Sequence, residues 1–325
     1  MEYAEGEPDA RLELYDDQSR SILSENDSPD LGFRFSVNPY RGCLHGCAYC
    51  YARPTHEYLG FGAGSDFERK ILVKRRAPEL LEQAFSKKSW QGELVVFSGN
   101  TDCYQPLERE LELTRGCLAV CARYRNPVHV ITKSALVERD IDLLVELSRE
   151  ADAGVTLSIP FFDEDTARAI EPYVPSPRRR LEAVRRLSEA GLDVSVNVAP
   201  LIPGLNDRDL VPILEAAAAA GARGAGLVPL RLPGSAADVF VERLRETMPL
   251  RAEKVLTRVR EMRGGKLNDP RFGERQRGSG RYIDTVFELF EVSVRRLGLT
   301  HRDPSPRPST FRRPGEAVQL GLFER

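Results

Sequence analysis

The sequence predicts an α/β fold in which six strands and the helices between them form a partial (β/α)6 barrel of the TIM type, with disordered tails at both ends. Three observations lead to this prediction. Short apolar runs alternate with amphipathic helical segments, a pattern typical of parallel strands joined by right-handed crossovers. Small and polar residues follow several of the runs, where β/α barrels carry their chemistry. There are six runs and not the eight of a closed barrel, so we expect an open barrel.

Each element is predicted from its own pattern. Residues 33–38 alternate apolar and polar side chains, and residues 94–97 are wholly apolar, as expected of a buried parallel strand. The other four strands are expected at residues 128–133, 154–159, 193–198 and 225–230. Helices are expected at residues 78–87, 107–124, 140–149, 163–170, 177–190 and 209–220.

The charge distribution sets the first domain boundary. Residues 1–30 carry ten acidic side chains and two arginines, a charge of −8, whereas the whole chain carries −2. Segments this rich in Asp, Glu and Ser cannot bury enough apolar surface to fold. We therefore expect a disordered acidic leader at 1–30 and the barrel at 31–262. A basic loop and a C-terminal helix packed on the barrel should follow at 263–300, and a Pro/Arg-rich tail at 301–325.

The sequence also bears on location. No apolar run approaches the roughly 20 residues that span a bilayer. The N-terminus is acidic, unlike a signal or transit peptide. We expect a cytoplasmic protein with no membrane partner.

Three of the six cysteines lie within residues 41–51, at the spacing Cys-x3-Cys-x2-Cys. Cys43, Cys47 and Cys50 are predicted to ligate three irons of a [4Fe–4S] cluster, which leaves the fourth iron open to a small molecule. Gly42 and Gly46 suit a loop that curls around such a group. The alternative is a zinc site that adds His45, but zinc sites usually pair a short Cys-x-x-Cys with a distant second pair, which this sequence lacks.

With Tyr49 directly before the third cysteine, this motif resembles the signature of the radical S-adenosylmethionine (SAM) superfamily. The resemblance implies that SAM chelates the open iron and that one electron from the cluster cleaves it to methionine and a 5′-deoxyadenosyl radical. A reducing partner such as flavodoxin or ferredoxin would supply the electron. The backbone near Tyr49 would meet the adenine. The small-residue loop after the second strand would contact the methionine amino group; it consists of Ser98, Gly99, Asn100 and Thr101.

Further polar side chains end the later strands. Lys133, Ser158 and Asn197 are expected at the same mouth of the barrel. They are candidates for cofactor binding, with Lys133 and Ser158 suited to the SAM ribose or carboxylate. The alternative for such residues is a helix cap. In that case Thr101 or Asp102 would start the helix expected at 107–124.

The order of the motifs narrows the resemblance. Asn-Pro-Tyr-Arg-Gly-Cys at 38–43, Thr-Asp-Cys-Tyr-Gln-Pro at 101–106 and Ile-Thr-Lys at 131–133 are similar to the group that includes spore photoproduct lyase, often called DNA-repair-photolyase-like. That enzyme returns a hydrogen atom through a cysteine and tyrosines. The resemblance implies catalytic roles for Tyr49 and Tyr51.

The other cysteines are interpreted by position. Cys103 follows the second strand, beside the expected radical site, and is a candidate hydrogen donor. Cys117 and Cys121 lie four apart on one helical face and are interpreted as buried small hydrophobes. A second cluster formed by these two with Cys103 is the alternative.

Two segments suggest contact with DNA. Residues 258–281 carry eight basic and three acidic side chains, and such charge can neutralise phosphates, although a solvated surface is equally consistent. The tail ends in a sequence similar to the peptide by which bacterial DNA-repair and replication proteins bind the sliding clamp. Its predicted contacts are Gln319, Leu320, Leu322 and Phe323; the alternative is a tail that packs on its own barrel.

The sequence thus predicts a radical SAM enzyme that abstracts hydrogen from a DNA base lesion, associated with the nucleoid when clamp-bound. Two alternatives remain. The substrate could be RNA or a peptide, or the protein could be a non-catalytic metal-binding partner of the clamp.

Overall fold

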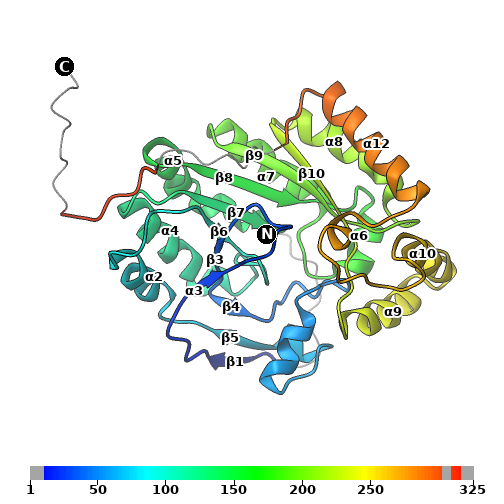
Figure 1. Ribbon diagram of the computed structural model, residues 1–325, viewed down its shortest axis with the longest axis horizontal. Helices are drawn as coiled ribbons and strands as arrows, with labels where there is room; N and C mark the ends of the chain where they lie inside the picture. The colour runs from blue at the N-terminus through cyan, green and yellow to red at the C-terminus, as the bar shows by residue number, and fades with distance from the viewer. Residues whose placement is uncertain (1–10, 302–308, 316–325) are drawn as a thin grey trace.

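A computed structural model describes residues 11–301 and 309–315. Its centre is a seven-stranded sheet in the order β10-β9-β8-β7-β6-β3-β2 (Figure 1). Only β2 runs antiparallel to its neighbour, and it covers one edge of the sheet. The other six strands are parallel and match the six predicted ones. The strands are β2 (Leu23–Glu25), β3 (Phe35–Val37), β6 (Val95–Phe97), β7 (Val128–Thr132), β8 (Ala153–Ser158), β9 (Asp193–Leu201) and β10 (Gly224–Pro229). The sheet has two edges, so the expected open, partial barrel is confirmed.

The helices between the strands also follow the prediction. They are α2 (Ala77–Ser86), α3 (Glu108–Leu111), α4 (Leu113–Arg123), α5 (Ile141–Glu150), α6 (Glu164–Ile170), α7 (Pro177–Glu189) and α8 (Leu210–Ala219). One expected helix is interrupted, because Glu112 takes a left-handed φ of 48° between α3 and α4. The buried Glu108 carboxylate accepts hydrogen bonds from the amides of Thr114 and Arg115, which satisfies donors at the start of α4.

A second, three-stranded sheet supports the cysteine loop. It consists of β1 (Glu13–Asp16), β5 (Lys70–Val73) and β4 (Tyr40–Arg41), with β1 parallel to β5. Short helices η1 (Arg53–Leu59) and α1 (Asp66–Arg69) connect the loop to β5. The prediction of a disordered leader over 1–30 is therefore wrong for its described part, since β1 and β2 pair with β5 and β3. Backbone hydrogen bonds hold these acidic strands, and such bonds do not require apolar side chains.

The C-terminal third adds α9 (Ala236–Thr247), α10 (Pro249–Met262), α11 (Glu274–Arg277) and α12 (Arg281–Arg296). On α12, Ile283, Val286 and Phe290 join the main core, as expected of a helix packed on the barrel. The tail was expected to be disordered, but residues 309–315 pack on the body. There, Phe311 lies with its ring centroid 5.9 Å from that of Phe85 and 5.9 Å from that of Tyr124.

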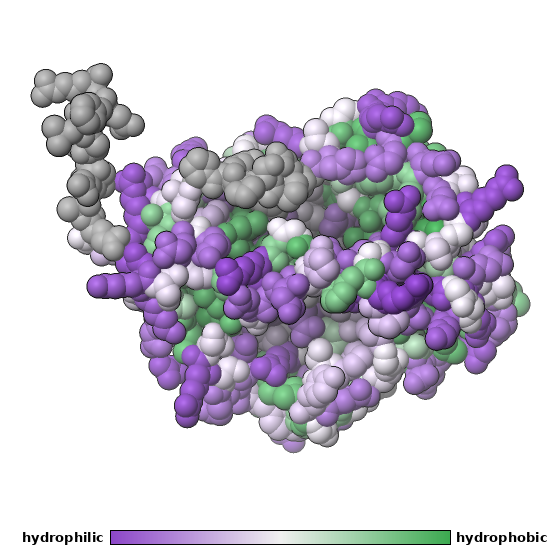
Figure 2. All heavy atoms as spheres, viewed as in Figure 1, coloured by the Kyte–Doolittle hydropathy of each residue, from purple (hydrophilic) through white to green (hydrophobic). Residues whose placement is uncertain are grey.

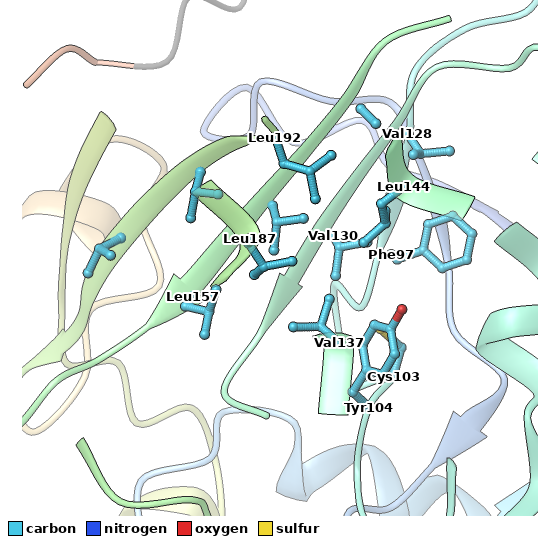
Figure 3. Packing of buried hydrophobic residues seen from close by; sticks show 14 of the residues in the cluster. Phe97, Cys103, Tyr104, Val128, Val130, Val137, Leu144, Leu157, Leu187 and Leu192 are labelled. Atoms are coloured by element: carbon cyan, nitrogen blue, oxygen red, sulfur yellow. The ribbon is translucent and has the colours of Figure 1, made fainter. Parts of the chain in front are cut away.

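The main core lies between the sheet and its surrounding helices (Figure 3). Side chains alternate along each strand, so Val194, Val196 and Val198 of β9 are fully buried while the residues between them are only half-buried. The outer surface is mainly polar on the face shown in Figure 2. Among the described residues, no helix combines the length and apolarity needed to cross a membrane.

Candidate active site

The cysteine loop follows β4 directly, and its two glycines are required by close packing. Gly42 has φ +82°, and a Cβ there would lie 2.8 Å from Ile71 Cδ1 and 2.9 Å from the Phe67 carbonyl. Gly46 has φ +65°, and a Cβ there would lie 3.0 Å from Tyr173 Cδ2. Any side chain would combine strain with a clash. The predicted reason for these glycines, a tightly curled loop, is confirmed by these angles.

A buried arginine holds the loop from one side. Arg53 is fully buried and donates from Nη2 to the Cys47 carbonyl at 2.8 Å and from Nη1 to the Ala63 carbonyl at 2.9 Å. It also forms an ion pair with Glu68. Arg243 reaches the same loop, donating to the Gly46 carbonyl at 2.7 Å. The backbone around the cysteines is thus fixed by guanidinium groups.

A buried amide holds the loop from the other side. Gln105 accepts a hydrogen bond from the Leu44 amide at 2.9 Å and donates to the Gly42 carbonyl at 3.1 Å. The sequence reasoning missed both Arg53 and Gln105. No spacing pattern marks a side chain that binds backbone carbonyls at a distance in sequence.

The three thiols fit the predicted cluster. Cys43 and Cys47 are buried and Cys50 is partly exposed. Burial, the Glu171 carboxylate and the other two thiols raise the pKa of Cys47, and burial and Cys43 raise that of Cys50. The charge of each of the other two thiolates thus acts on Cys47.

The grouping of donors bears on the zinc alternative. Within 11–301 and 309–315, no three His, Cys, Asp or Glu side chains are grouped to hold a single metal ion. A [4Fe–4S] cluster does not need such convergence, because each thiolate binds a different iron. His45 instead lies with Nδ1 3.4 Å from Asp102 Oδ2. The donor set suits a cluster better than zinc.

Asp102 connects the cysteine loop to the end of β7. Besides His45, its carboxylate accepts from Thr132 Oγ1 at 2.6 Å, the Lys133 amide at 2.8 Å and the Tyr104 amide at 2.9 Å. Burial alone would raise the pKa of Asp102, but the hydrogen bond and charge of His45 together with these donors lower it to about 2. The N-cap of α3 is Leu107, so Asp102 is not the helix cap that the sequence offered as an alternative.

The loop predicted to meet SAM lies at the mouth, but two of its side chains are already engaged. Ser98 donates to the Ile131 carbonyl at 2.6 Å, and Thr101 donates to the Tyr40 carbonyl at 2.9 Å. Gly99 has φ +83° and is exposed, and Asn100 is half-buried. Contact with a ligand is therefore expected from the backbone at Gly99 and from Asn100, more than from the two hydroxyls.

Tyr49 lies in a buried charged network. Its hydroxyl donates to Glu171, which is paired with Arg180 at 2.6 Å, and both charged side chains are fully buried. Arg180 also donates to the Ser158 carbonyl at 2.8 Å, and Lys133 Nζ lies 5.6 Å from the centroid of the Tyr49 ring. Burial, Cys47 and Glu171 raise the pKa of Tyr49, so its phenol stays protonated.

The structure therefore places Lys133 beside Tyr49 and links the Ser158 carbonyl to the same charged network through Arg180, while the cofactor-binding roles of these residues stay predictions. Sequence reasoning missed Glu171 and Arg180, because nothing in their local pattern separates them from the exposed charges of neighbouring helices. Asn197 lies on the half-buried face of β9, next to Gly226 of β10. A Cβ atom on Gly226 would lie only 2.2 Å from Asn197 Oδ1, so the asparagine side chain fills the space beside this glycine.

The two remaining catalytic candidates differ sharply in exposure. Tyr51 has 45% of its surface exposed, and its hydroxyl donates to the Gly99 carbonyl at 2.7 Å. Cys103 is 0% exposed and lies among Phe97 and Val130 in the core (Figure 3). Its sulfur accepts a hydrogen bond from Ser98 Oγ at 3.4 Å, and Thr114 and Ser98 also bind its backbone. The donor role of Cys103 stays a prediction: the thiol is buried, and it lies beside Ser98 of the loop expected to meet SAM.

Cys117 and Cys121 are 0% exposed on α4, so their interpretation as buried small hydrophobes is confirmed.

Comparison with known proteins identifies the class. A family model described as the radical SAM superfamily matches residues 37–217, more than half of the chain. The chain belongs to the radical SAM superfamily, and a [4Fe–4S] cluster and SAM are its cofactors.

Three individual proteins show what the chain is similar to in sequence or in structure. An uncharacterized protein of Mycobacterium tuberculosis strain H37Rv is 37% identical over 296 residues, which cover 90% of this chain and 83% of that protein. The radical SAM Nα-GlyT isomerase of Pseudomonas phage M6 is 22% identical over 88% of this chain and 57% of its own. The solved structure of spore photoproduct lyase complexed with dinucleoside spore photoproduct has a TM-score of 0.61 at 15% identity, over 88% of this chain and 80% of that one. At this identity the last similarity establishes the fold.

The cofactors and the protein side chains contribute different parts of the reaction. When bound, the cluster supplies the electron for reductive cleavage of SAM. Cys43, Cys47 and Cys50 would hold it, while Arg53 and Gln105 fix the loop that carries them. Tyr49 and Lys133 would orient SAM from one wall of the mouth.

Proposed function

We propose that this radical SAM enzyme abstracts a hydrogen atom from a base lesion in DNA. The observation that carries the proposal is the structural similarity to spore photoproduct lyase over 88% of the chain, which a DNA-repair enzyme with this fold would explain. The solved structure of that enzyme holds dinucleoside spore photoproduct. Tyr51, exposed at the mouth beside Gly99, offers an aromatic surface for a base.

The basic segment 258–281 supports the proposal less than its charge suggests. Arg258 pairs with Glu261 at 2.9 Å and Arg271 with Asp269 at 2.6 Å. Arg275 pairs with Asp30. Much of the positive charge is therefore compensated within the protein.

The decisive experiment measures 5′-deoxyadenosine release by the anaerobically reconstituted protein. Flavodoxin or dithionite serves as reductant, and the added substrates are UV-damaged DNA, undamaged DNA, RNA and peptide. We expect damaged DNA to raise release at least about tenfold, because binding energy from the substrate is used at the reacting centre. A rise with RNA or peptide alone would replace the proposal with that alternative. Absence of cleavage in every arm would favour the non-catalytic alternative.

We further propose that the C-terminal peptide tethers the enzyme to the sliding clamp, and so to the nucleoid. Gln319, Leu320, Leu322 and Phe323 lie outside the described residues. The segment before them supports the idea, because Thr310 donates to the Arg125 carbonyl at 3.0 Å. Arg125 lies just before β7, at the end of the barrel opposite the mouth. A tether from this end would leave the mouth accessible (Figure 1).

Deleting the peptide should abolish clamp binding. A chain ending at Gly315 keeps the packed segment 309–315 and loses the proposed anchors, so retention on immobilised clamp should fall at least about tenfold while cluster content stays unchanged. Leu320→Ala combined with Phe323→Ala should give the same loss, and Glu324→Gln, outside the matching peptide, should not. Equal retention of the full and shortened chains would contradict the tether.

A further inference from the structure

Arg231 is a cation at the barrel mouth that forms no ion pair with a described carboxylate. It lies two residues beyond the end of β10 (Gly224–Pro229), at the same edge of the sheet as the loop 98–101. Its guanidinium carbon is 5.7 Å from the centroid of the Tyr51 ring. Its Nε is buried and has no hydrogen-bond partner among the described residues. A half-buried guanidinium with an unused donor thus lies against an exposed tyrosine.

The positive charge of Arg231 is energetically unfavourable, because it is partly buried and lies near other guanidinium groups. Arg263 donates to the Leu230 carbonyl at 2.6 Å, and burial and the charge of Arg231 lower its pKa to about 10. Burial and the charge of Arg275 in turn lower the pKa of Arg231. The nearby Asp30 is engaged by Arg275 and by the Gly273 amide at 2.7 Å. Arg231 and Arg275 therefore share one committed carboxylate, Asp30, whereas the carboxylates of Asp269 and Glu274 act on Arg263. Burying unmatched charge destabilises a fold unless a ligand compensates it.

Tyr51 connects Arg231 to the reaction centre. The Tyr51 ring lies against the guanidinium, its hydroxyl donates to the Gly99 carbonyl, and the residue follows Cys50 directly in the chain. An anion held by Arg231 would therefore lie beside the aromatic surface at the mouth. A planar guanidinium with several donors matches the oxygens of a phosphate, which it can bind through two hydrogen bonds.

We propose that Arg231 binds a backbone phosphate of a nucleic-acid substrate and thereby positions the adjacent base against Tyr51. This inference rests on the proposed function and names its substrate contact. The SAM carboxylate is the competing anion. Phosphate is favoured because Lys133, on the Tyr49 side of the site, already supplies a cation there.

The test compares Arg231→Gln with Arg223→Gln. Arg223 is exposed and precedes β10, so its substitution removes the same charge at the opposite end of the same strand. Fluorescence anisotropy with a labelled, undamaged single-stranded oligonucleotide gives Kd over a range of salt concentrations, using the reconstituted full chain. SAM affinity is measured in parallel.

We expect Arg231→Gln to weaken oligonucleotide binding roughly 5- to 20-fold and to reduce the slope of log Kd against log salt by about one. Arg231→Lys should keep the slope and lose part of the affinity, because it retains charge without the planar fork. Arg223→Gln should match the wild type, and SAM affinity should stay within about twofold. Thermal unfolding should be unchanged or higher for Arg231→Gln, since no ion pair is broken.

The outcomes separate this inference from the proposed function. Oligonucleotide binding that is unchanged in Arg231→Gln would overturn the phosphate contact alone. A loss of SAM affinity with oligonucleotide binding intact would assign the arginine to the SAM carboxylate. If the wild-type chain binds no oligonucleotide, both proposals are overturned. If binding depends on Arg231 but damaged DNA does not stimulate SAM cleavage, the phosphate contact stands and only the repair function is overturned.

Discussion

Cys43→Ala is expected to abolish both iron incorporation and SAM cleavage. The loop 42–50 offers three thiolates, and a cluster that binds one per iron would lose a third of its protein ligands. Cys43 is buried, with 6% of its surface exposed, so few other donors can reach the iron in place of its sulfur. The measurements are iron and sulfide content after anaerobic reconstitution, with about four irons expected in the wild type, and 5′-deoxyadenosine release.

Cys103→Ala is the matched control, because it deletes the same atom from a buried cysteine that is not expected to bind iron. Its sulfur packs in the sheet–helix core, so we expect full iron content and normal SAM cleavage, with unfolding free energy lower by roughly 1–2 kcal/mol. SAM cleavage that survives in Cys43→Ala would refute the ligand assignment. An altered product with Cys103→Ala, at normal SAM cleavage, would support the predicted role of Cys103 as hydrogen donor.

Arg53→Met is expected to destabilise the protein and to empty the cluster site. The substitution leaves the buried Glu68 with Arg243 as its one remaining partner among the described residues and removes the donors to the carbonyls of Cys47 and Ala63. Removing one partner from a buried ion pair costs about 3–5 kcal/mol. Urea unfolding of the cluster-free protein and iron content after reconstitution measure the two effects separately.

Two further variants serve as controls for Arg53→Met. Arg178→Met deletes an exposed guanidinium from α7 and should change unfolding free energy by no more than about 0.5 kcal/mol. Arg53→Lys keeps the charge but cannot reach several carbonyls at once, so it should fall between wild type and Arg53→Met. Wild-type stability and iron content in Arg53→Met would show that the loop does not depend on this guanidinium.

The elements that the sequence predicted correctly are those with a local signature. Six strands were found because each is a short apolar or alternating run, and such runs specify burial whatever lies beside them. The strands β1 and β2 were missed because they are short, mostly exposed and set in an acidic segment, so that backbone pairing is what makes them strands. The segment 309–315 was missed because one aromatic residue, Phe311, and polar contacts of Thr310 and Arg313 with backbone carbonyls hold it, and these leave no local pattern in the sequence.

Part of the site could also be predicted from the sequence. Lys133, Ser158 and Asn197 were expected at one mouth by the rule that parallel strands share a C-terminal edge. The sequence did not show how far Cys103 is buried, because position on a strand-end loop does not determine the exposure of a side chain. Cys103 is 0% exposed and its sulfur accepts a hydrogen bond from Ser98 Oγ at 3.4 Å, so its donor role stays a prediction.

What the sequence determined by itself is the chemistry: three cysteines at fixed spacing, with an aromatic residue before the third, define a ligand set within one loop of the chain. What only the tertiary structure decided is how that loop is held and what it faces. Arg53, Gln105, Glu171 and Arg231 act on it through contacts that depend on the three-dimensional path of the chain. The physical reason is that a thiolate triad needs only local geometry, whereas a buried charge finds its partner, or remains without one, only when distant segments are packed together.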